Sequence, residues 1–269
     1  MVLDSGRDTS LLIDIDDPPP VLEENTQGRS PFLLVADHYG RAMPRALGDL
    51  GLPGSELERH IALDIGIAGV AHALADHLDA HLIAQRYSRL VIDCNRPPPS
   101  PNSIPRISER TVIPGNEALT HEAAEARRRE VFEPYHRRIG EAIDRRVSQG
   151  IPTVLVALHS FTPVYAGIAR PWHVGTLYRR DTPLPALLLK GLRANSELVV
   201  GDNEPYAVSE ETDYTIPVHG EARGLMNSGI EIRQDLIAEE AGQSEWAERL
   251  ANIFREIETE LRAQLLLRA

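Results

Sequence analysis

The stretch FLLVADHYG, residues 32–40, decides the fold of this chain. Its first five residues are all apolar, which is typical of a strand buried on both faces in a parallel sheet covered by helices. The run ends abruptly in polar residues and a glycine. Ligands of open α/β sheets bind beyond the carboxyl ends of the strands. The stretch therefore predicts a buried strand at residues 32–36 and a candidate site residue, His38, directly after it.

A second stretch repeats this arrangement, because the apolar run at residues 153–158 ends at His159 and Ser160. Apolar periodicity elsewhere predicts helices and strands in alternation. We expect strands at 81–84, 89–93, 172–178, 197–200 and 230–233, and helices at 61–77, 120–149, 184–194 and from Ser244 onward. Such alternation indicates an α/β fold in which a mainly parallel sheet lies between helices.

The composition limits the class of protein. The chain has 269 residues, of which 42% are hydrophobic and 25% charged, and this predicts a globular protein with a sizeable core. The formal net charge of -12 argues against a nucleic-acid partner, since phosphate binding relies on clustered Lys and Arg. No apolar run approaches the roughly 18 residues that a membrane span needs, so we expect no membrane partner either.

The negative charge is unevenly distributed. Residues 1–30 hold seven acids and two bases, and we expect them to form an acidic leader that is solvated or loosely docked. Residues 31–269 are expected to form a single domain. Residues 86–110, in contrast, hold five arginines and two acids, so their local charge is +3. Local potential steers a small ligand more than net charge does, so a small anionic substrate is compatible with this chain.

The compartment and one unusual loop can also be predicted. The single cysteine, Cys94, makes an intramolecular disulfide impossible, which fits a reducing compartment. The first twenty residues lack the basic and apolar regions of a signal peptide, so we expect a cytoplasmic protein.

Residues 97–119 contain six prolines and form a loop of more than 20 residues, which makes them a candidate binding loop.

His38 and His159 are the candidate metal ligands. Each follows or ends an apolar run, and neutral imidazole is a favoured ligand of zinc. The alternative is a histidine that caps a strand end and satisfies a neighbouring carbonyl group. Two such histidines on separate strands favour the metal site, although the chain has no HExxH motif and no pair of CxxC motifs.

A cluster of polar residues surrounds the predicted strand at 89–93. Arg89, Asn95 and Arg96 can clamp a carboxylate in bidentate fashion. Alternatively, the two arginines pair with Asp93 or another acid in a structural network. Cys94 can act as the nucleophile of a cysteine hydrolase, but buried cysteines more often serve as small apolar residues.

Glu231 lies between two isoleucines in a short segment of β-like pattern. Such a carboxylate can be desolvated, which raises its pKa toward the range useful for a general base. The alternative is an edge strand whose glutamate points to solvent.

Together these segments resemble the N-formylglutamate amidohydrolase family. The similarity runs from about Pro31 to the C-terminal helix, and the motifs are specific as an ordered set rather than singly. The motifs that carry it are Asp37-His38-Tyr39-Gly40 with Pro44, residues 60–66 (HIALDIG), 88–97 (SRLVIDCNRP), 158–163 (LHSFTP), 200–206 (VGDNEPY) and 231–234 (EIRQ).

The resemblance implies a fold and a metal. The family is related to zinc carboxypeptidases and aspartoacylases, so it implies a three-layer α/β/α sandwich of the phosphorylase/hydrolase-like, zinc carboxypeptidase-like type. It also implies one zinc ion per chain, with His38 and His159 as ligands. The carboxypeptidase pattern has an acidic ligand three residues after the first histidine, where this chain has Arg41. We therefore expect Asp64 to be the third ligand.

The resemblance further implies a hydrolase acting on a linear amide bond. Glu231 occupies the place of the catalytic glutamate, Arg89 assists catalysis, and Arg89, Asn95 and Arg96 resemble groups that hold a substrate carboxylate. The implied reaction is hydrolysis of N-formylglutamate, or of a related N-acyl amino acid, to formate and glutamate. A deacylase of a different N-acyl amino acid or peptide, a cysteine hydrolase using Cys94 and a non-catalytic binding protein remain as alternatives.

Overall fold

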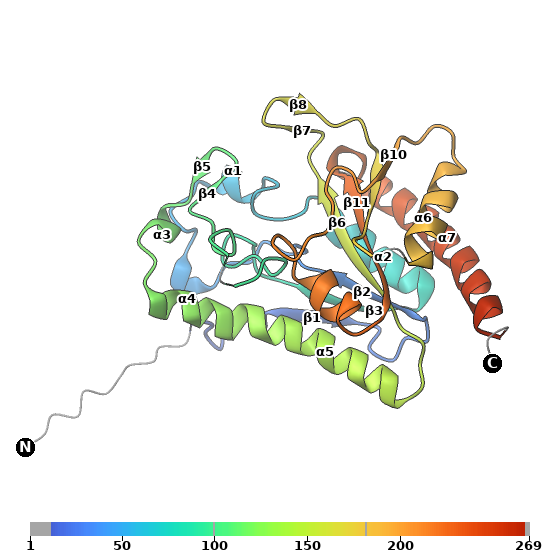
Figure 1. Ribbon diagram of the computed structural model, residues 1–269. Coiled ribbons are helices and arrows are strands. Elements are labelled where there is room, and N and C mark those ends of the chain that lie inside the picture. Colours follow the sequence, from blue (N-terminus) through green and yellow to red (C-terminus); the bar gives the residue numbers. More distant parts are fainter. Residues whose placement is uncertain (1–11, 99, 181, 267–269) are drawn as a thin grey trace, which may run out of the picture.

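The computed structural model describes residues 12–98, 100–180 and 182–266. Its centre is a seven-stranded sheet that lies between layers of helices (Figure 1). In spatial order the strands are β1 (Val21–Glu24), β3 (His81–Gln85), β2 (Phe32–Ala36), β6 (Val154–Phe161), β11 (Met226–Arg233), β9 (Val174–Leu177) and β10 (Val200–Asp202).

The sheet is mixed and mainly parallel. β2 runs parallel to both β3 and β6, and β11 runs parallel to β6. β9 and β10 are parallel to each other, while β1 and β9 are antiparallel to β3 and β11 respectively. The predicted fold class is therefore confirmed, and the carboxyl ends of β2, β6 and β11 lie at one edge of the sheet.

Two hairpins and several helices complete the structure. The hairpins pair β4 (Ile107–Ser108) with β5 (Thr111–Val112) and β7 (Val164–Tyr165) with β8 (Ile168–Ala169). The helices are α1 (Gly54–Leu57), α2 (Ile67–Leu78), α3 (Pro114–Glu117), α4 (His121–Arg127), α5 (Glu133–Ser148), α6 (Pro183–Arg193) and α7 (Glu240–Leu266). Short 3₁₀ turns are η1 (Arg45–Leu47) and η4 (Gln234–Leu236), and π-helical turns are η2 (Arg128–Phe132) and η3 (Ile216–Glu221).

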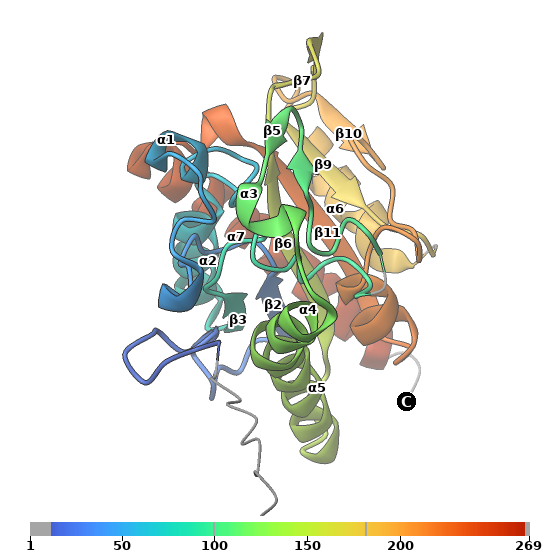
Figure 2. The same cartoon turned by 90° about the vertical axis from the view of Figure 1, so that its left-hand side faces the viewer.

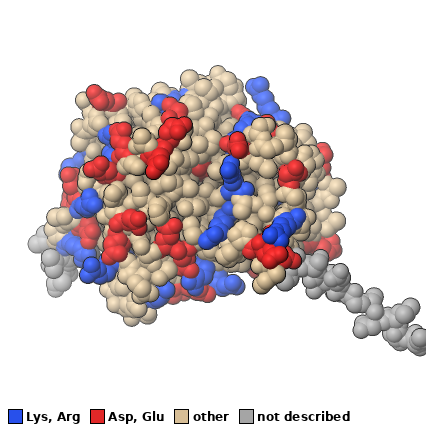
Figure 3. Space-filling model, turned by 180° about the vertical axis from the view of Figure 1, so that it is seen from behind, with Lys and Arg blue, Asp and Glu red and all other residues tan. Residues whose placement is uncertain are grey.

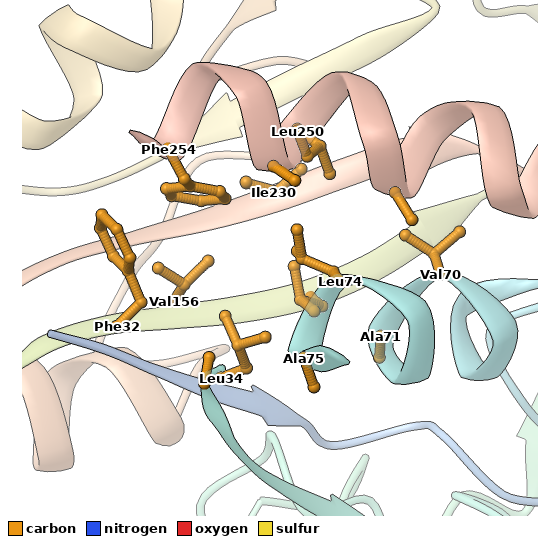
Figure 4. Close-up of a cluster of buried hydrophobic side chains, with 14 of the residues drawn as sticks. Phe32, Leu34, Val70, Ala71, Leu74, Ala75, Val156, Ile230, Leu250 and Phe254 are labelled. Atoms are coloured by element: carbon orange, nitrogen blue, oxygen red, sulfur yellow. The ribbon is translucent and has the colours of Figure 1, made fainter. Parts of the chain in front are cut away.

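Alternate residues of each central strand enter two different cores. Phe32 and Leu34 of β2 pack with α2 and α7 on one face, where Phe254 of α7 lies 4.6 Å from Phe32 between ring centroids (Figure 4). Leu33 of β2 packs with α5 on the other face. Because both faces are covered, every residue of β2 is fully buried, which explains the continuous apolar run in the sequence.

The prediction of a strand at residues 89–93 is wrong. Leu90 and Val91 are buried as predicted, but their carbonyl groups accept hydrogen bonds from the side chains of Asn116 and Arg127 rather than from a neighbouring strand. Backbone polar groups must be satisfied when they are buried, and here two distant side chains satisfy them. An apolar run alone does not reveal such partners.

The helix expected at residues 61–77 begins only at Ile67. Gly66 precedes it with a φ of 79°, and a Cβ atom at this position would lie 2.0 Å from the carbonyl oxygen of Ile237. Only glycine fits both the left-handed conformation and this close approach. Asp64 consequently lies in the turn before α2 and not within the helix.

The boundary between an acidic leader and a domain at residue 31 stays a prediction, and residues 1–11 lie outside the described residues. Within residues 12–30, however, β1 is an edge strand of the main sheet. Glu23 of β1 accepts hydrogen bonds from Arg138 and contacts His81 at 3.0 Å, so its charge is compensated by the body of the protein. Residues 21–24 are thus docked on the sheet, whereas residues 14–16 are exposed.

The remaining predictions concern the long helix, the loop and the surface. Residues 120–149 do form consecutive helical segments, α4, η2 and α5. Residues 97–119 include the hairpin β4–β5, which Figure 2 shows on the same side of the molecule as α3.

Acidic and basic side chains are interspersed over the face seen in Figure 3. No helix in the described part is long and apolar enough to cross a membrane, and the cytoplasmic location stays a prediction.

The packing of α7 on the sheet can be tested at Phe254, which is fully buried. We expect Phe254→Ala to lower the free energy of unfolding by about 3–5 kcal/mol, since it removes a large aromatic side chain from a close-packed core. Urea denaturation measures this difference. Glu256→Ala, at an exposed position of the same helix, is the control and should change the value by less than about 0.5 kcal/mol. Equal effects of the two substitutions would contradict the assigned core.

Candidate metal centre and active site

Three side chains from different parts of the chain meet at the carboxyl edge of the sheet. His38 follows β2, His159 lies in the neighbouring parallel strand β6, and Asp64 lies in the turn before α2. Asp64 Oδ2 is 3.4 Å from His38 Nδ1 and 3.0 Å from His159 Nδ1. All three are buried, and one ligand atom from each lies within 4.8 Å of the others. This His-Asp-His cluster could hold a metal ion.

A second pair of carboxylates holds the other nitrogen of each imidazole. His38 Nε2 is 2.7 Å from Asp93 Oδ1, and His159 Nε2 is 3.3 Å from Asp37 Oδ2. A carboxylate at one ring nitrogen fixes the tautomer and leaves the lone pair of the other nitrogen for a metal. Both Nδ1 atoms thus face Asp64, so the donor set and its supporting shell fit a divalent metal.

The charge balance of this cluster also fits a cation. Burial lowers the pKa of His159, but its hydrogen bonds to Asp37 and Asp64 outweigh that effect and raise the pKa well above its usual value. Burial raises the pKa of Asp37, but the contacts with His159 prevail and bring it to about 2. The cluster therefore favours positive charge at its centre. Metal binding would displace the protons on Nδ1.

Arg89 takes part in a structural network with acidic side chains. Such a network was the alternative to a substrate clamp in the sequence analysis. Its guanidinium donates to Asp93 Oδ2 at 2.6 Å and to Asp64 Oδ1 at 3.4 Å. The side chain is only 23% exposed. Arg89 thus orients one candidate ligand, Asp64, and one residue that holds His38.

Asn95 and Arg96 are also engaged by the protein itself. Asn95 Oδ1 accepts hydrogen bonds from the backbone N–H groups of Tyr214 and Thr215, and its Nδ2 donates to Asp213. Arg96 Nη1 donates to the carbonyl oxygens of Asn95 and Thr212, and no carboxylate pairs with Arg96 among the described residues. The charge of Arg96 is therefore available to an anion.

Glu231 lies beside His159, because the two residues are paired in register across β11 and β6. It is buried, and its Oε2 has no hydrogen-bond partner among the described residues. Burial raises the pKa of Glu231 to about 7 despite the opposing effect of the neighbouring His159. An unpartnered carboxyl group with such a pKa is suited to accept and return a proton near neutral pH.

All seven residues expected to form the site line one cavity of about 410 Å³. They are His38, Asp64, Arg89, Asn95, Arg96, His159 and Glu231. The sequence analysis missed other wall residues, notably His60 and Glu109, which lies at the tip of the hairpin β4–β5. It also missed Tyr165 and Tyr206, which stand at the exposed mouth. His60 and Tyr206 do belong to motifs that carry the family resemblance, and these motifs could have identified them as site residues.

Cys94 does not belong to the site. It is fully buried, lies in the core between the sheet and α5, and is absent from the cavity wall. Burial raises the pKa of the thiol well above its usual value, whereas a nucleophilic cysteine needs a lowered one. The structure thus favours the apolar packing role.

Comparison with known proteins places this site in a family. The family model described as N-formylglutamate amidohydrolase matches residues 30–238. The chain is similar to a gene product of Agrobacterium tumefaciens, with 37% identity over 93% of this chain and 99% of that chain and a TM-score of 0.90.

A structure described as N-formylglutamate amidohydrolase from Ralstonia eutropha has the same fold. The identity is 19%, the alignment covers 92% of this chain and 100% of that chain, and the TM-score is 0.69. The comparison with curated proteins gave no match. The match of the family model over most of the sequence shows that the chain belongs to the N-formylglutamate amidohydrolase family.

Proposed function

We propose that this chain is a zinc-dependent amidohydrolase that cleaves the N-formyl amide, or a related N-acyl amide, of an acidic amino acid. With N-formylglutamate as substrate the products are formate and glutamate. The observation that carries the proposal is the position of Glu231, a buried and unpartnered carboxyl group next to the His-Asp-His cluster in the same cavity.

Zinc is the proposed metal because two imidazoles and one carboxylate are a common ligand set of catalytic zinc sites, which keep a fourth position open. His38, Asp64 and His159 would hold it. When bound, a zinc ion lowers the pKa of water and polarises a carbonyl oxygen. Asp93 and Asp37 would orient the two imidazoles, and Arg89 would orient Asp64 and Asp93.

Glu231 would act as the general base and then as the general acid. In its ionised form it accepts a proton from the water that attacks the acyl carbon. It then returns this proton to the nitrogen of the leaving amine, so that the C–N bond breaks with release of a neutral amine. A carboxyl group whose pKa is raised toward neutral pH is suited both to accept this proton and to return it.

The arginines of the cavity would bind and stabilise negative charge. Two nitrogens of Arg89 are engaged with carboxylates, and its remaining N–H groups can stabilise the oxyanion that forms at the acyl oxygen. Arg96, supported by Asn95, would bind the α-carboxylate of the substrate.

A deacylase of a larger N-acyl group is the second candidate function. A cavity of about 410 Å³ lies within the usual range for small-molecule sites and has room for more than a formyl group. Amine release from N-formyl, N-acetyl and longer N-acyl derivatives of one amino acid distinguishes the two functions. The cysteine hydrolase alternative predicts inactivation by iodoacetamide but not by a chelator.

Metal analysis tests the proposed centre directly. We expect about one zinc per chain and loss of amine release after treatment with a chelator. His159→Ala should lose both metal and activity, because it removes one of three protein ligands. His77→Ala, at an exposed histidine of α2, should keep both. A metal-free protein with full, chelator-resistant activity would overturn the proposal.

The role of the supporting carboxylates is tested by Asp93→Asn. This change should weaken zinc affinity by about 10- to 100-fold, because His38 loses the anion that fixes its ring. Competition with a zinc-binding dye measures the affinity. Asp76→Asn, at an exposed position on α2, is the matched control and should leave it unchanged. Equal affinity of Asp93→Asn and wild type would show that the carboxylate does not support the centre.

Glu231→Gln separates the chemical step from metal binding. We expect kcat to fall by about 10²- to 10⁴-fold, because the amide can neither accept nor return the proton. Zinc content should stay at the wild-type level. In the wild type the rate should fall as the pH is lowered through the pKa of Glu231, since protonation removes the base. The variant should lack this acidic limb, and a variant that retains it would exclude Glu231 as the titrating group.

A further inference from the structure

Small and apolar residues line the cavity on the face of the sheet that carries Glu231. Ala157 of β6, Gly229 of β11 and Leu177 of β9 form a row across three neighbouring strands, since Gly229 is paired in register with both of the others. Two residues further along the strands lies the register pair of His159 and Glu231. Residues two apart in a strand point to the same face and lie about 7 Å apart. The row therefore borders the position of the proposed general base, and all of its residues line the cavity.

Two further side chains complete an apolar floor, which consists of Ala157, Leu177, Val208, Ile216 and Gly229. Val208 and Ile216 also line the cavity, and they belong to the same hydrophobic cluster as Ala157 and Leu177. A Cβ atom at Gly229 would lie 3.2 Å from Leu177 Cβ and 3.4 Å from Ile216 Cδ1, so these two side chains meet over the glycine. None of the four side chains is more than 6% exposed. The floor is therefore closed and offers aliphatic groups to a ligand.

The cavity wall has one uncompensated cationic side chain. Arg89 and Arg96 are the only arginine or lysine residues that line the cavity in the described part of the chain. Arg89 is paired with Asp64 and Asp93, whereas Arg96 donates to carbonyl groups. Burial lowers the pKa of His60, which is therefore neutral near pH 7. The wall thus provides a counter-charge for one carboxylate, and an acidic N-acyl amino acid carries two.

One segment of the chain joins Arg96 to the apolar floor. The carbonyl oxygen of its Thr212 accepts a hydrogen bond from Arg96, and its Val208 and Ile216 belong to the floor. An N-acyl amino acid whose α-carboxylate is bound by Arg96 and whose acyl carbon lies beside Glu231 has its Cα between these two residues. The side chain on that Cα starts next to the floor, which leaves the acyl group to point toward the mouth.

We propose that the apolar floor binds the amino acid side chain, so that the enzyme prefers N-acyl derivatives of apolar amino acids, such as leucine, over those of glutamate. An apolar side chain is stabilised there by its removal from water. A side-chain carboxylate would lose its hydration without gaining a cation, and Asp213 in the same wall would repel it. This inference rests on the proposed function for its reaction and for the role of Arg96, and it replaces the acidic amino acid with an apolar one.

The first test compares N-formyl-L-leucine with N-formyl-L-glutamate. We expect wild type to have a kcat/KM about 10- to 100-fold higher for the leucine derivative, because the glutamate carboxylate would be buried without a partner. N-formyl-L-glutamine, which lacks the second charge, should lie between the two. An equal or higher value for N-formyl-L-glutamate than for N-formyl-L-leucine would overturn the inference while leaving the proposed reaction intact.

A variant of the floor tests which residues make the selection. Ile216→Ala should lower the ratio of kcat/KM for N-formyl-L-leucine to that for N-formyl-L-alanine by about 10-fold, because the methyl group of alanine is too short to reach the floor. The ratio is measured on one preparation, so a reduced folded fraction does not affect it. Val147→Ala, at an exposed position of α5, is the control and should leave the ratio unchanged. An unchanged ratio in Ile216→Ala would contradict the assignment of the floor.

Binding without turnover separates this inference from the proposed function. Calorimetry on the zinc-loaded protein compares 4-methylpentanoate with propionate, which share the carboxylate and differ in the apolar end. Wild type should bind 4-methylpentanoate about 10- to 100-fold more tightly, and Ile216→Ala should reduce the difference. If no N-acyl amino acid is hydrolysed but this difference is found, the proposed function fails and the apolar site stands. If hydrolysis occurs without any difference in binding, the apolar site fails and the proposed function stands.

Discussion

The structure depends on a single buried carboxylate, Asp64. It contacts the Nδ1 atoms of His38 and His159, accepts a hydrogen bond from the backbone N–H of Ser160, and receives a further one from Arg89. An ionised carboxylate in the interior is costly unless it is paired and hydrogen-bonded. The four partners come from the end of β2, from β6 and from the loop after β3, so the carboxylate fixes the relative positions of three segments.

The surrounding charges explain why a cation belongs at this point. Asp37, Asp64 and Asp93 have lowered pKa values and are ionised near neutral pH, whereas burial keeps the pKa of Glu231 raised. Arg89 supplies one permanent positive charge, which leaves two negative charges uncompensated. A divalent metal would neutralise both, and the same carboxylates raise the pKa of the two histidines. Burial, together with the charge of Asp64, raises the pKa of Glu231, whereas His159, His38 and Arg89 oppose the shift.

The sequence allowed the sheet and the histidines to be predicted because both follow from local patterns. A strand buried on both faces is mostly apolar, and polar residues at the end of the apolar run then mark the carboxyl edge of the sheet, as at Asp37 and His38 and at His159. The segment at 89–93 could not be predicted, because its backbone is satisfied by Asn116 and Arg127 from a distant loop and helix. The contact of Asp93 with His38 could not be predicted either, for a related reason. Sequence patterns show that an acid is present but not which imidazole it holds.

The arrangement of positive charge shows how an acidic chain can still present positive charge in its cavity. The net charge of -12 is distributed over acids that are mostly paired or solvated, while the cavity brings together Arg89 and Arg96. Each arginine differs in how far the protein neutralises it. Arg89 is paired with two carboxylates, whereas Arg96 donates only to carbonyl groups. The charge of Arg89 is thus compensated within the protein, and that of Arg96 is available to an anion. A small anion that enters the cavity would therefore be attracted by Arg96, although the chain as a whole is acidic.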